Sequence, residues 1–152
     1  MHLVRTPVKL ILAGGTAEVK RYEDLIKTHG GGDRVTMRGF VTDDELVELY
    51  ANSLGVCYLP FDEDYGYVTL EAMLSGKPVV VPSDGGGAAE LVDHDNNGLI
   101  SDPDPRALAD CLDSLYADRA RARRMGEHGR EKLESMNLSW ERVVQKLMEG
   151  AA

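Results

Sequence analysis

Two glutamates that stand eight positions apart, Glu63 and Glu71, are the side chains of this sequence with the clearest chemical potential. Gly66 lies in the turn between them, and an apolar pattern of helical spacing begins directly after the turn. The first amides of a helix have no partner inside the helix, and the helix dipole makes that end positive. The segment could therefore offer backbone N–H groups and two carboxylates to one ligand.

The chemistry of such a segment suits a ligand that is anionic in one part and rich in hydroxyls in another. Gly66 would let the ligand approach the backbone closely. Three amides at the helix start are expected to be free for a diphosphate, those of Tyr67, Val68 and Thr69. Glu71 could accept two ribose hydroxyls, and Glu63 could accept one from a sugar. A nucleotide diphosphate-sugar has these parts. The simpler alternative is that Glu71 only complements the helix dipole and Glu63 is a solvated loop residue.

Composition narrows the classes of protein that this chain can represent. Its 152 residues suit one domain with a real core. The net charge of −9 argues against a nucleic-acid surface or a polybasic membrane patch. No apolar run reaches transmembrane length, and the N-terminus lacks the apolar core of a signal peptide. Cys57 and Cys111 are interpreted as free buried thiols of a cytosolic protein.

Short apolar runs alternate with amphipathic stretches along the chain. The runs predict strands at Val8–Ala13, Arg34–Arg38, Val56–Leu59, Pro78–Val81 and Gly98–Ser101. Helices are predicted at Glu18–Thr28, after a capping box of Thr42 and Glu45, at Tyr67–Ser75, near Ala88–Val92, from Pro105, at Arg119–Glu134, and from Ser139 to Met148. This alternation predicts an α/β fold, a Rossmann-like parallel sheet with helices on both faces and extra C-terminal helices. Trp140 is expected to anchor the last helix in the core.

Loops at the carboxyl ends of the strands are where an open α/β sheet binds its ligand. Three loops with suitable residues are expected there, Gly14-Gly15-Thr16, Arg38-Gly39-Phe40 and Asp62–Val68. A fourth loop, Asp84–Gly87, is a weaker candidate. The sequence therefore predicts a ligand site assembled from separate βα turns.

The segment Pro60–Val81 resembles the signature of retaining glycosyltransferases of family 4, which have the GT-B fold. That signature has two glutamates separated by seven residues, a Gly-containing aromatic turn, a Glu-Ala-Met triplet and a later Gly-x-Pro-Val-Val. This chain matches it with Glu63, Tyr65, Gly66, Tyr67, Val68, Glu71-Ala72-Met73, Gly76 and Pro78-Val79-Val80. Segments on both sides also resemble the family, and the likeness extends from about Val8 to Met148.

The resemblance implies a role for each matching residue. Glu63 would be the catalytic residue, contacting the donor hexose and helping to stabilise charge at its anomeric carbon. Glu71 would bind the ribose hydroxyls. Donors to the diphosphate and hexose would come from Gly66, Tyr67, Val68 and Thr69. Arg38, Gly39 and Phe40 would flank the base. Gly14 and Gly15 would let the diphosphate pass close to the backbone.

The same resemblance implies a domain that is incomplete at its front. The family opens this domain with one more strand and helix, which carry an Arg and a Lys that clamp the diphosphate. Residues 1–152 are thus expected to be the donor-binding domain without its first βα unit and without the N-terminal acceptor domain. One flank of a strand would then be exposed unless Met1–Arg5 or a partner covers it, and a second copy could join at that edge.

The expected activity is transfer of a hexose from a nucleotide diphosphate-sugar to an acceptor, with retention at the anomeric carbon. The acceptor would be a saccharide or lipid-linked molecule held by the missing domain. No metal or other cofactor is expected, although Asp62-Glu63-Asp64 has the spacing of the Asp-x-Asp metal motif of the other glycosyltransferase fold. The full protein is expected in the cytoplasm, with any membrane association through the missing domain, and this chain alone is expected to be inactive.

Two other functions stand beside the transferase. The chain could be a non-catalytic module that binds nucleotide-sugar, or an inactive fragment. It could also be an unrelated doubly wound domain such as a phosphorelay receiver. A receiver needs acidic residues after its first and third strands, where this sequence has Gly14-Gly15 and Pro60. The receiver is therefore disfavoured.

Overall fold

The computed structural model of the chain describes residues 1–15 and 17–149, so Thr16 lies outside the described residues. The strands are β1 (Leu10–Ala13), β2 (Val35–Gly39), β3 (Val56–Cys57), β4 (Val79–Pro82) and β5 (Gly98–Ser101). The helices are α1 (Val19–Thr28), α2 (Asp43–Asn52), α3 (Tyr67–Leu74), α4 (Gly87–Glu90), α5 (Pro105–Ala117), α6 (Arg119–Met136) and α7 (Trp140–Glu149). The predicted α/β fold with parallel strands is confirmed.

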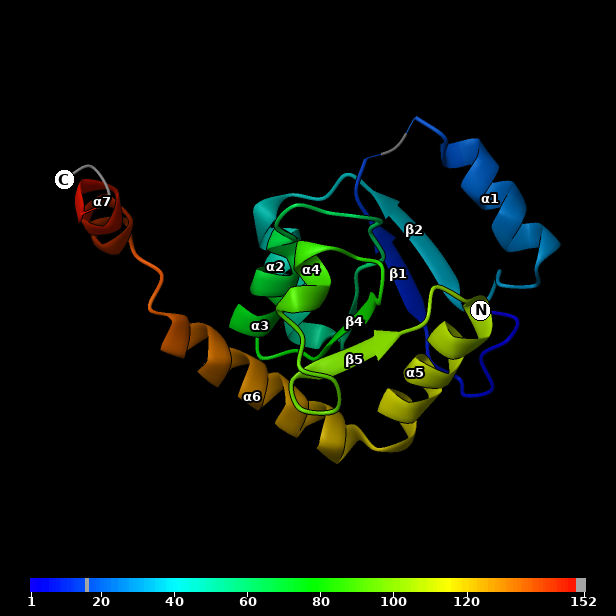
Figure 1. Ribbon diagram of the computed structural model, residues 1–152. Helices are drawn as coiled ribbons and strands as arrows, with labels where there is room; N and C mark the ends of the chain where they lie inside the picture. The colour runs from blue at the N-terminus through cyan, green and yellow to red at the C-terminus, as the bar shows by residue number, and fades with distance from the viewer. Residues whose placement is uncertain (16, 150–152) are drawn as a thin grey trace.

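The strands form two parallel sheets, where the sequence predicted one. One sheet has the order β1-β2, and the other has the order β3-β4-β5. Figure 1 shows the pair β1 and β2 beside the three-stranded sheet. Strand β3 is also shorter than predicted, because only Val56 and Cys57 pair with β4. The prediction of a single sheet was therefore wrong in its continuity, although every strand pair is parallel.

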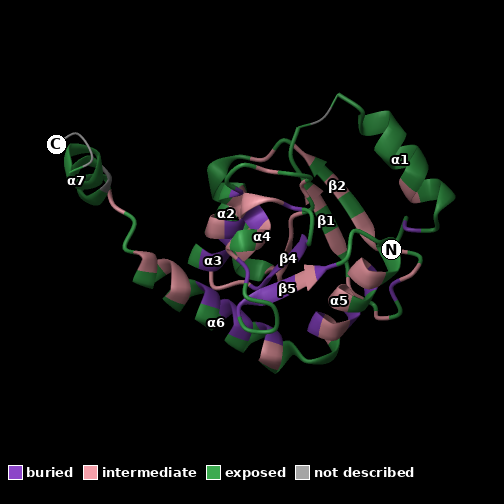
Figure 2. Cartoon of the chain, in the orientation of Figure 1, coloured by how far each residue is buried: buried purple, intermediate pink, exposed green. Residues whose placement is uncertain are grey.

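Helices cover both faces of β4, as predicted. Val79 and Val81 belong to one apolar cluster with Ala72 of α3 and Ala88 of α4. Val80 points the other way and packs with residues of β5, α5 and α6, namely Leu99, Leu115, Ala122 and Met125. Alternate side chains of a strand face opposite sides of its sheet, so a strand covered on both faces is apolar throughout. The buried residues accordingly gather on this part of the molecule (Figure 2).

A cavity of about 1640 Å³ separates the facing edges of the two sheets. Its lining includes all of β1 and β3, together with residues of α2 and α5. The amide of Leu10 donates to the Arg34 carbonyl just before β2, and that of Gly14 donates to Gly39 of β2. The amides of Val56 and Tyr58 donate to the carbonyls of Pro78, just before β4, and Val80. Because successive residues of a strand point their amides to opposite edges, those of Ile11 and Cys57 face away from these partners. Each sheet thus presents an unpaired edge on the cavity side.

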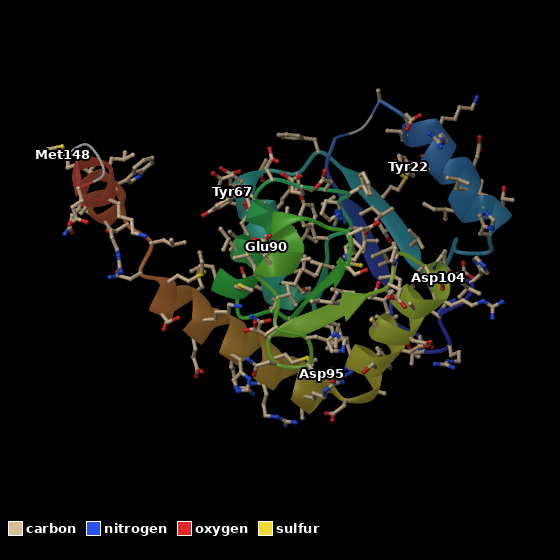
Figure 3. All side chains as sticks on the ribbon, viewed as in Figure 1. Tyr22, Tyr67, Glu90, Asp95, Asp104 and Met148 are labelled. Atoms are coloured by element: carbon tan, nitrogen blue, oxygen red, sulfur yellow. The ribbon has the colours of Figure 1, made fainter. Side chains whose placement is uncertain are left out.

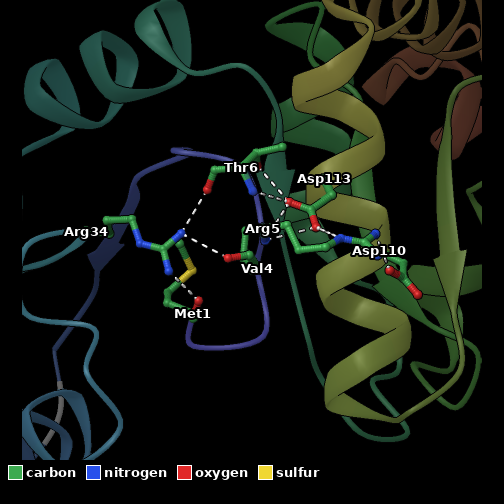
Figure 4. A network of polar contacts seen from close by, with 7 residues as sticks. All are labelled: Met1, Val4, Arg5, Thr6, Arg34, Asp110 and Asp113. Atoms are coloured by element: carbon green, nitrogen blue, oxygen red, sulfur yellow. Dashed lines mark hydrogen bonds and ion pairs between the residues drawn. The ribbon is translucent and has the colours of Figure 1, made fainter.

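The N-terminal segment before β1 links the two-stranded sheet to helix α5 through hydrogen bonds (Figure 4). The Arg34 guanidinium donates to the carbonyls of Met1, Val4 and Thr6, at 2.7, 3.2 and 2.8 Å. The Asp113 carboxylate of α5 accepts from the amides of Arg5 and Thr6 and from the Thr6 hydroxyl. The segment therefore joins the residue preceding β2 to α5, and part of it lines the cavity.

The last helix is not packed as the sequence suggested. Trp140 is 81% exposed, so the expectation that it anchors α7 in the core was wrong. Helix α6 ends at Met136, the left-handed backbone of the following Asn137 turns the chain, and α7 stands away from the sheets (Figure 1). Cys57 and Cys111 are both free, as predicted, but each is partly buried, where the sequence predicted buried thiols. Among the described residues, no helix combines the length and the apolar character that a membrane crossing would need.

Candidate functional site

The start of α3 has the backbone geometry that the sequence predicted, with one exception. Gly66 is the N-cap residue, is buried, and has a φ of 73°, a conformation that glycine adopts most readily. In the part of the chain that the structure describes, the amides of Tyr67 and Val68 have no hydrogen-bond partner. The Thr69 amide was expected to be free but donates to the Gly66 carbonyl at 2.9 Å, because the first turn closes tightly.

The Thr69 side chain is also turned away from solvent. The residue is fully buried, and its hydroxyl oxygen has no hydrogen-bond partner among the described residues. By contrast, Tyr67 is 70% exposed (labelled in Figure 3), and its ring lies 5.0 Å from that of Tyr65. Among the described residues, the helix start therefore has unpaired amides at Tyr67 and Val68 and an unpaired but buried hydroxyl at Thr69.

The loop Asp84–Gly87 supports the backbone that carries Glu63. The Gly87 amide donates to the Glu63 carbonyl at 2.7 Å, and the Asp62 amide donates to the Asp84 carbonyl at 2.9 Å. A side chain at Gly86 would place its Cβ 2.5 Å from the Glu63 carbonyl oxygen. Real Cβ atoms do not approach backbone so closely, so this glycine allows the two loops to touch. The fourth candidate loop thus joins the site as a support.

Each of the two glutamates is held by a tyrosine from another element. The Tyr50 hydroxyl, in the last turn of α2, donates to Oε2 of Glu71 at 2.8 Å. The Tyr58 hydroxyl, just after β3, donates to Oε2 of Glu63 at 3.1 Å. Burial, followed by the adjoining carboxylate, raises the pKa of both phenols. Both phenols therefore stay protonated and remain hydrogen-bond donors at neutral pH.

The carboxyl ends of β1 and β2 are joined beside the cavity. The Gly14 amide donates to the Gly39 carbonyl at 2.8 Å, after a register shift between Leu12 and Ala13. The residues of the predicted site that line the cavity are Gly14, Gly15, Arg38, Phe40, Val68 and Glu71. Phe40 is 85% exposed, so an aromatic face is available there. The predicted loops at Gly14 and Arg38 therefore meet at one cavity with the first turns of α3.

Glu63, Gly66, Tyr67, Thr69 and Gly39 do not line this cavity, although Glu63 is linked to it. Tyr58 belongs to the lining and bonds to Glu63 through its hydroxyl. Tyr50 also lines the cavity. Neither tyrosine was predicted to belong to the site. Tyr58 lies inside the predicted strand Val56–Leu59, and its place near the end of that apolar run was the only signal available for it.

Metal ligands do not converge at this site. Asp62 and Asp64 are both exposed, and Asp62 has a left-handed backbone with a φ of 48°. Within residues 1–15 and 17–149, no group of three or more His, Cys, Asp or Glu side chains is placed to hold an ion. The described donors at the site are instead backbone amides and phenolic hydroxyls.

Comparison with known proteins identifies the class to which this geometry belongs. Residues 2–132 match the family described as Glycosyl transferases group 1, and the chain belongs to that family. It is 31% identical over 144 residues to a D-inositol 3-phosphate glycosyltransferase of Corynebacterium diphtheriae, covering 92% of this chain and 33% of the relative. It is 33% identical over 146 residues to a GDP-mannose-dependent alpha-(1-6)-phosphatidylinositol monomannoside mannosyltransferase of Mycobacterium tuberculosis, covering 91% and 37%.

Solved structures agree with the sequence relatives. The chain is 29% identical to Anabaena HepE in complex with UDP-glucose, with a TM-score of 0.83 over 99% of this chain and 42% of HepE. It is 33% identical to a sucrose-phosphate synthase of Thermosynechococcus elongatus, with a TM-score of 0.78 over 93% and 37%. The fold is therefore that of a GT-B glycosyltransferase C-terminal domain. The chain spans about a third of the length of the curated relatives it matches.

Proposed function

We propose that this chain is the donor-binding half of a retaining glycosyltransferase of family 4 that uses a nucleotide diphosphate-sugar. The observation that carries the proposal is the start of α3, where two free amides lie between two glutamates that are each held by a tyrosine. A neighbour of the same fold, HepE, forms complexes with UDP and with UDP-glucose. An anionic leaving group suits a helix N-terminus, which supports the same location here.

In this proposal, different groups of the chain bind different parts of the donor. The amides of Tyr67 and Val68 and the α3 dipole stabilise the leaving diphosphate, so that this charge needs no metal ion. Glu71 accepts the ribose hydroxyls. Glu63 accepts a hexose hydroxyl and stabilises positive charge as it develops at the anomeric carbon, while the hexose passes to the acceptor with retention.

In this proposal, the loops that follow β1 and β2 contact the diphosphate and the base of the donor. Gly14 and Gly15 have no side chain to obstruct the diphosphate, and both line the cavity. Arg38, Gly39 and Phe40 flank the base, with the exposed Phe40 ring as a stacking surface. This division assigns the base to the two-stranded sheet and the sugars to the start of α3.

The acceptor, a saccharide or lipid-linked molecule, belongs in this proposal to a domain outside this chain. A further βα unit would fill the cavity between β1 and β3 and complete one continuous sheet. Alone, the chain would bind donor without transferring it, which makes a non-catalytic binding module the second candidate. Two free cysteines suit a cytoplasmic location. A second copy that covers the open edges would be an alternative to the missing unit.

Calorimetry with UDP and GDP, and with UDP-glucose and GDP-mannose, tests the donor site. Glu71→Ala should weaken the binding of each nucleotide by about 1.5–3 kcal/mol, the typical contribution of a hydrogen bond to a charged group. Glu23→Ala, a change at an exposed residue of α1, is the matched control and should leave affinity unchanged.

Hydrogen exchange locates the bound nucleotide. Ligand should slow exchange of the amides between Gly66 and Glu71, since donors engaged by a diphosphate are protected. Absence of protection at millimolar nucleotide, or protection confined to another element, would contradict a donor site at α3. Transfer activity gained only when an acceptor domain is supplied would separate the enzyme from the binding module.

A further inference from the structure

We propose that Tyr50 and Tyr58 are positioning residues that fix the two glutamates in their ligand-accepting orientations. This inference rests on the proposed donor site and extends it to two residues that no motif contains. Tyr50 acts on the carboxylate assigned to the ribose, and Tyr58 acts on the carboxylate assigned to the hexose. The two tyrosines therefore control separate parts of one ligand.

Tyr50 is itself held firmly enough to orient Glu71. Its ring packs against the buried cluster that contains Ala72 and Val79. Its carbonyl accepts from both the amide and the hydroxyl of Ser53, at 3.2 and 3.0 Å. The Lys77 ammonium also donates to carbonyls at the end of α2, those of Ala51 and Ser53. Only the hydroxyl of this anchored tyrosine reaches Glu71, which is exposed.

Tyr58 is anchored in a different way. Its amide donates to the Val80 carbonyl at 3.0 Å, which fixes its backbone beside β4. Its ring packs against the same buried cluster as that of Tyr50. Its hydroxyl then reaches Glu63, five positions later in the chain, across the turn that precedes Gly66. Packing against the core therefore fixes the ring of Tyr58, and the hydrogen bond to Glu63 fixes the direction of its hydroxyl.

The two hydrogen bonds leave the same part of each carboxylate available. Each tyrosine bonds to Oε2, and among the described residues Oε1 of Glu63 and Oε1 of Glu71 have no partner. A glutamate in solvent samples several rotamers, and binding must then select one of them. Fixing the carboxylate beforehand removes that entropy loss from the binding step. This is the physical advantage that the tyrosines supply.

A merely structural role makes a different prediction. If the hydroxyls only satisfied their own hydrogen-bonding needs, removing them would change stability and leave ligand selectivity intact. A positioning role requires that each hydroxyl affect only the part of the ligand that its glutamate contacts. Selectivity between a nucleoside diphosphate and its hexose conjugate therefore distinguishes the two roles.

The experiment compares Tyr50→Phe and Tyr58→Phe with the wild-type chain by calorimetry. UDP, GDP and ADP are each titrated with and without the attached hexose, and the measurements use the pair that the wild-type chain binds. Tyr50→Phe should weaken both members of the pair by about 2- to 10-fold, the loss expected from one freed side chain. Tyr58→Phe should weaken only the hexose conjugate, by about the same factor.

Two controls make the result specific. Tyr22→Phe, on α1 and labelled in Figure 3, removes the hydroxyl of a tyrosine that neither lines the cavity nor bonds to either glutamate, and it should change neither affinity. A double-mutant cycle then tests whether each tyrosine acts through its glutamate. In a Glu71→Ala background, which removes the hydrogen-bond acceptor, Tyr50→Phe should have at most a small further effect, and the same holds for Tyr58→Phe with Glu63→Ala.

The outcomes separate this inference from the proposed function. A wild-type chain that binds none of the nucleotides at millimolar concentration overturns the donor site and this inference together. Wild-type binding with unchanged affinities in both Phe variants, or with effects that add fully in the cycles, overturns the positioning role alone. Equal weakening of diphosphate and conjugate by Tyr58→Phe would also contradict it.

Discussion

At the scale of single residues, Gly66 is a position where backbone conformation and packing both demand glycine. Its φ of 73° is one that L residues rarely adopt, and a Cβ there would lie 2.7 Å from the Cβ of Ala88. The residue thus sets the start of α3 and brings it against α4. Gly76 has a similar φ of 64° but open space around the position of a Cβ. Comparing these two glycines therefore allows a separation of the cost of backbone strain from the cost of steric crowding.

Replacing these glycines by alanine tests that separation. Gly76→Ala should lower the free energy of unfolding by about 1–3 kcal/mol, the strain of a left-handed non-glycine residue. Gly66→Ala should lower it by about 1–3 kcal/mol more, since the new methyl group overpacks the contact with Ala88. Urea denaturation measures both values. Equal losses in the two variants would show that the close contact contributes nothing.

At the scale of elements, the N-terminal segment depends on one carboxylate of α5. Burial alone would raise the pKa of Asp113, but hydrogen bonds from Thr6 and Arg5 outweigh it and lower the pKa to about 2. An unfolded aspartate has a pKa of about 3.9. The unfolded chain therefore binds the proton more readily, so this contribution to stability is present above about pH 4 and is lost as the pH falls towards 2.

The pH dependence of unfolding checks this contribution. The wild-type free energy of unfolding should fall between about pH 4 and pH 2, and Asp113→Asn should fall less steeply over that interval. At pH 7, Asp113→Asn should be less stable by about 1–3 kcal/mol, because the donors of Arg5 and Thr6 lose their charged acceptor. Asp110→Asn is the control: its exposed ion pair with Arg5 should contribute at most about 1 kcal/mol. Parallel pH profiles for Asp113→Asn and wild type would contradict the assignment.

At the scale of the whole molecule, the divided sheet is the main departure from a compact doubly wound domain. The cavity of about 1640 Å³ exceeds the roughly 300–1,000 Å³ of ordinary ligand pockets. It extends from the site loops at Gly14 and Arg38 to Leu108 and Leu112 of α5. A nucleotide-sugar would occupy one end, and the apolar remainder between two unpaired edges suits a strand and its helix.

Supplying such a unit should complete the sheet. A strand–helix segment of about 30 residues, taken from immediately before the matching region of the Corynebacterium relative, would be fused ahead of Met1. The fusion should unfold at a higher temperature than the chain alone and should bind nucleotide more tightly, since the site loops would gain a fixed neighbour. A scrambled segment of the same composition is the control. Equal melting temperatures for the two fusions would argue against a strand in this cavity.

Structural features that depend only on residues close together in the chain could be predicted from the sequence. Thr42 and Glu45 form the predicted capping box, with bonds of 3.3 and 2.8 Å, and Asp104 caps α5 in front of Pro105. The strand Gly98–Ser101 has the predicted bounds. Such features depend on contacts within a few positions, so local residue types suffice to specify them. The same holds for the turn at Gly66, whose backbone conformation only glycine adopts readily.

Features that depend on distant segments emerged only once the chain was folded. The pairing of Tyr50 with Glu71 joins residues 21 positions apart, and nothing local marks either as the partner of the other. The break between β1 and β3 and the exposed Trp140 likewise depend on which surfaces find a neighbour. Short-range patterns specify an element and its buried face, whereas the element that covers that face is settled by packing across the whole molecule.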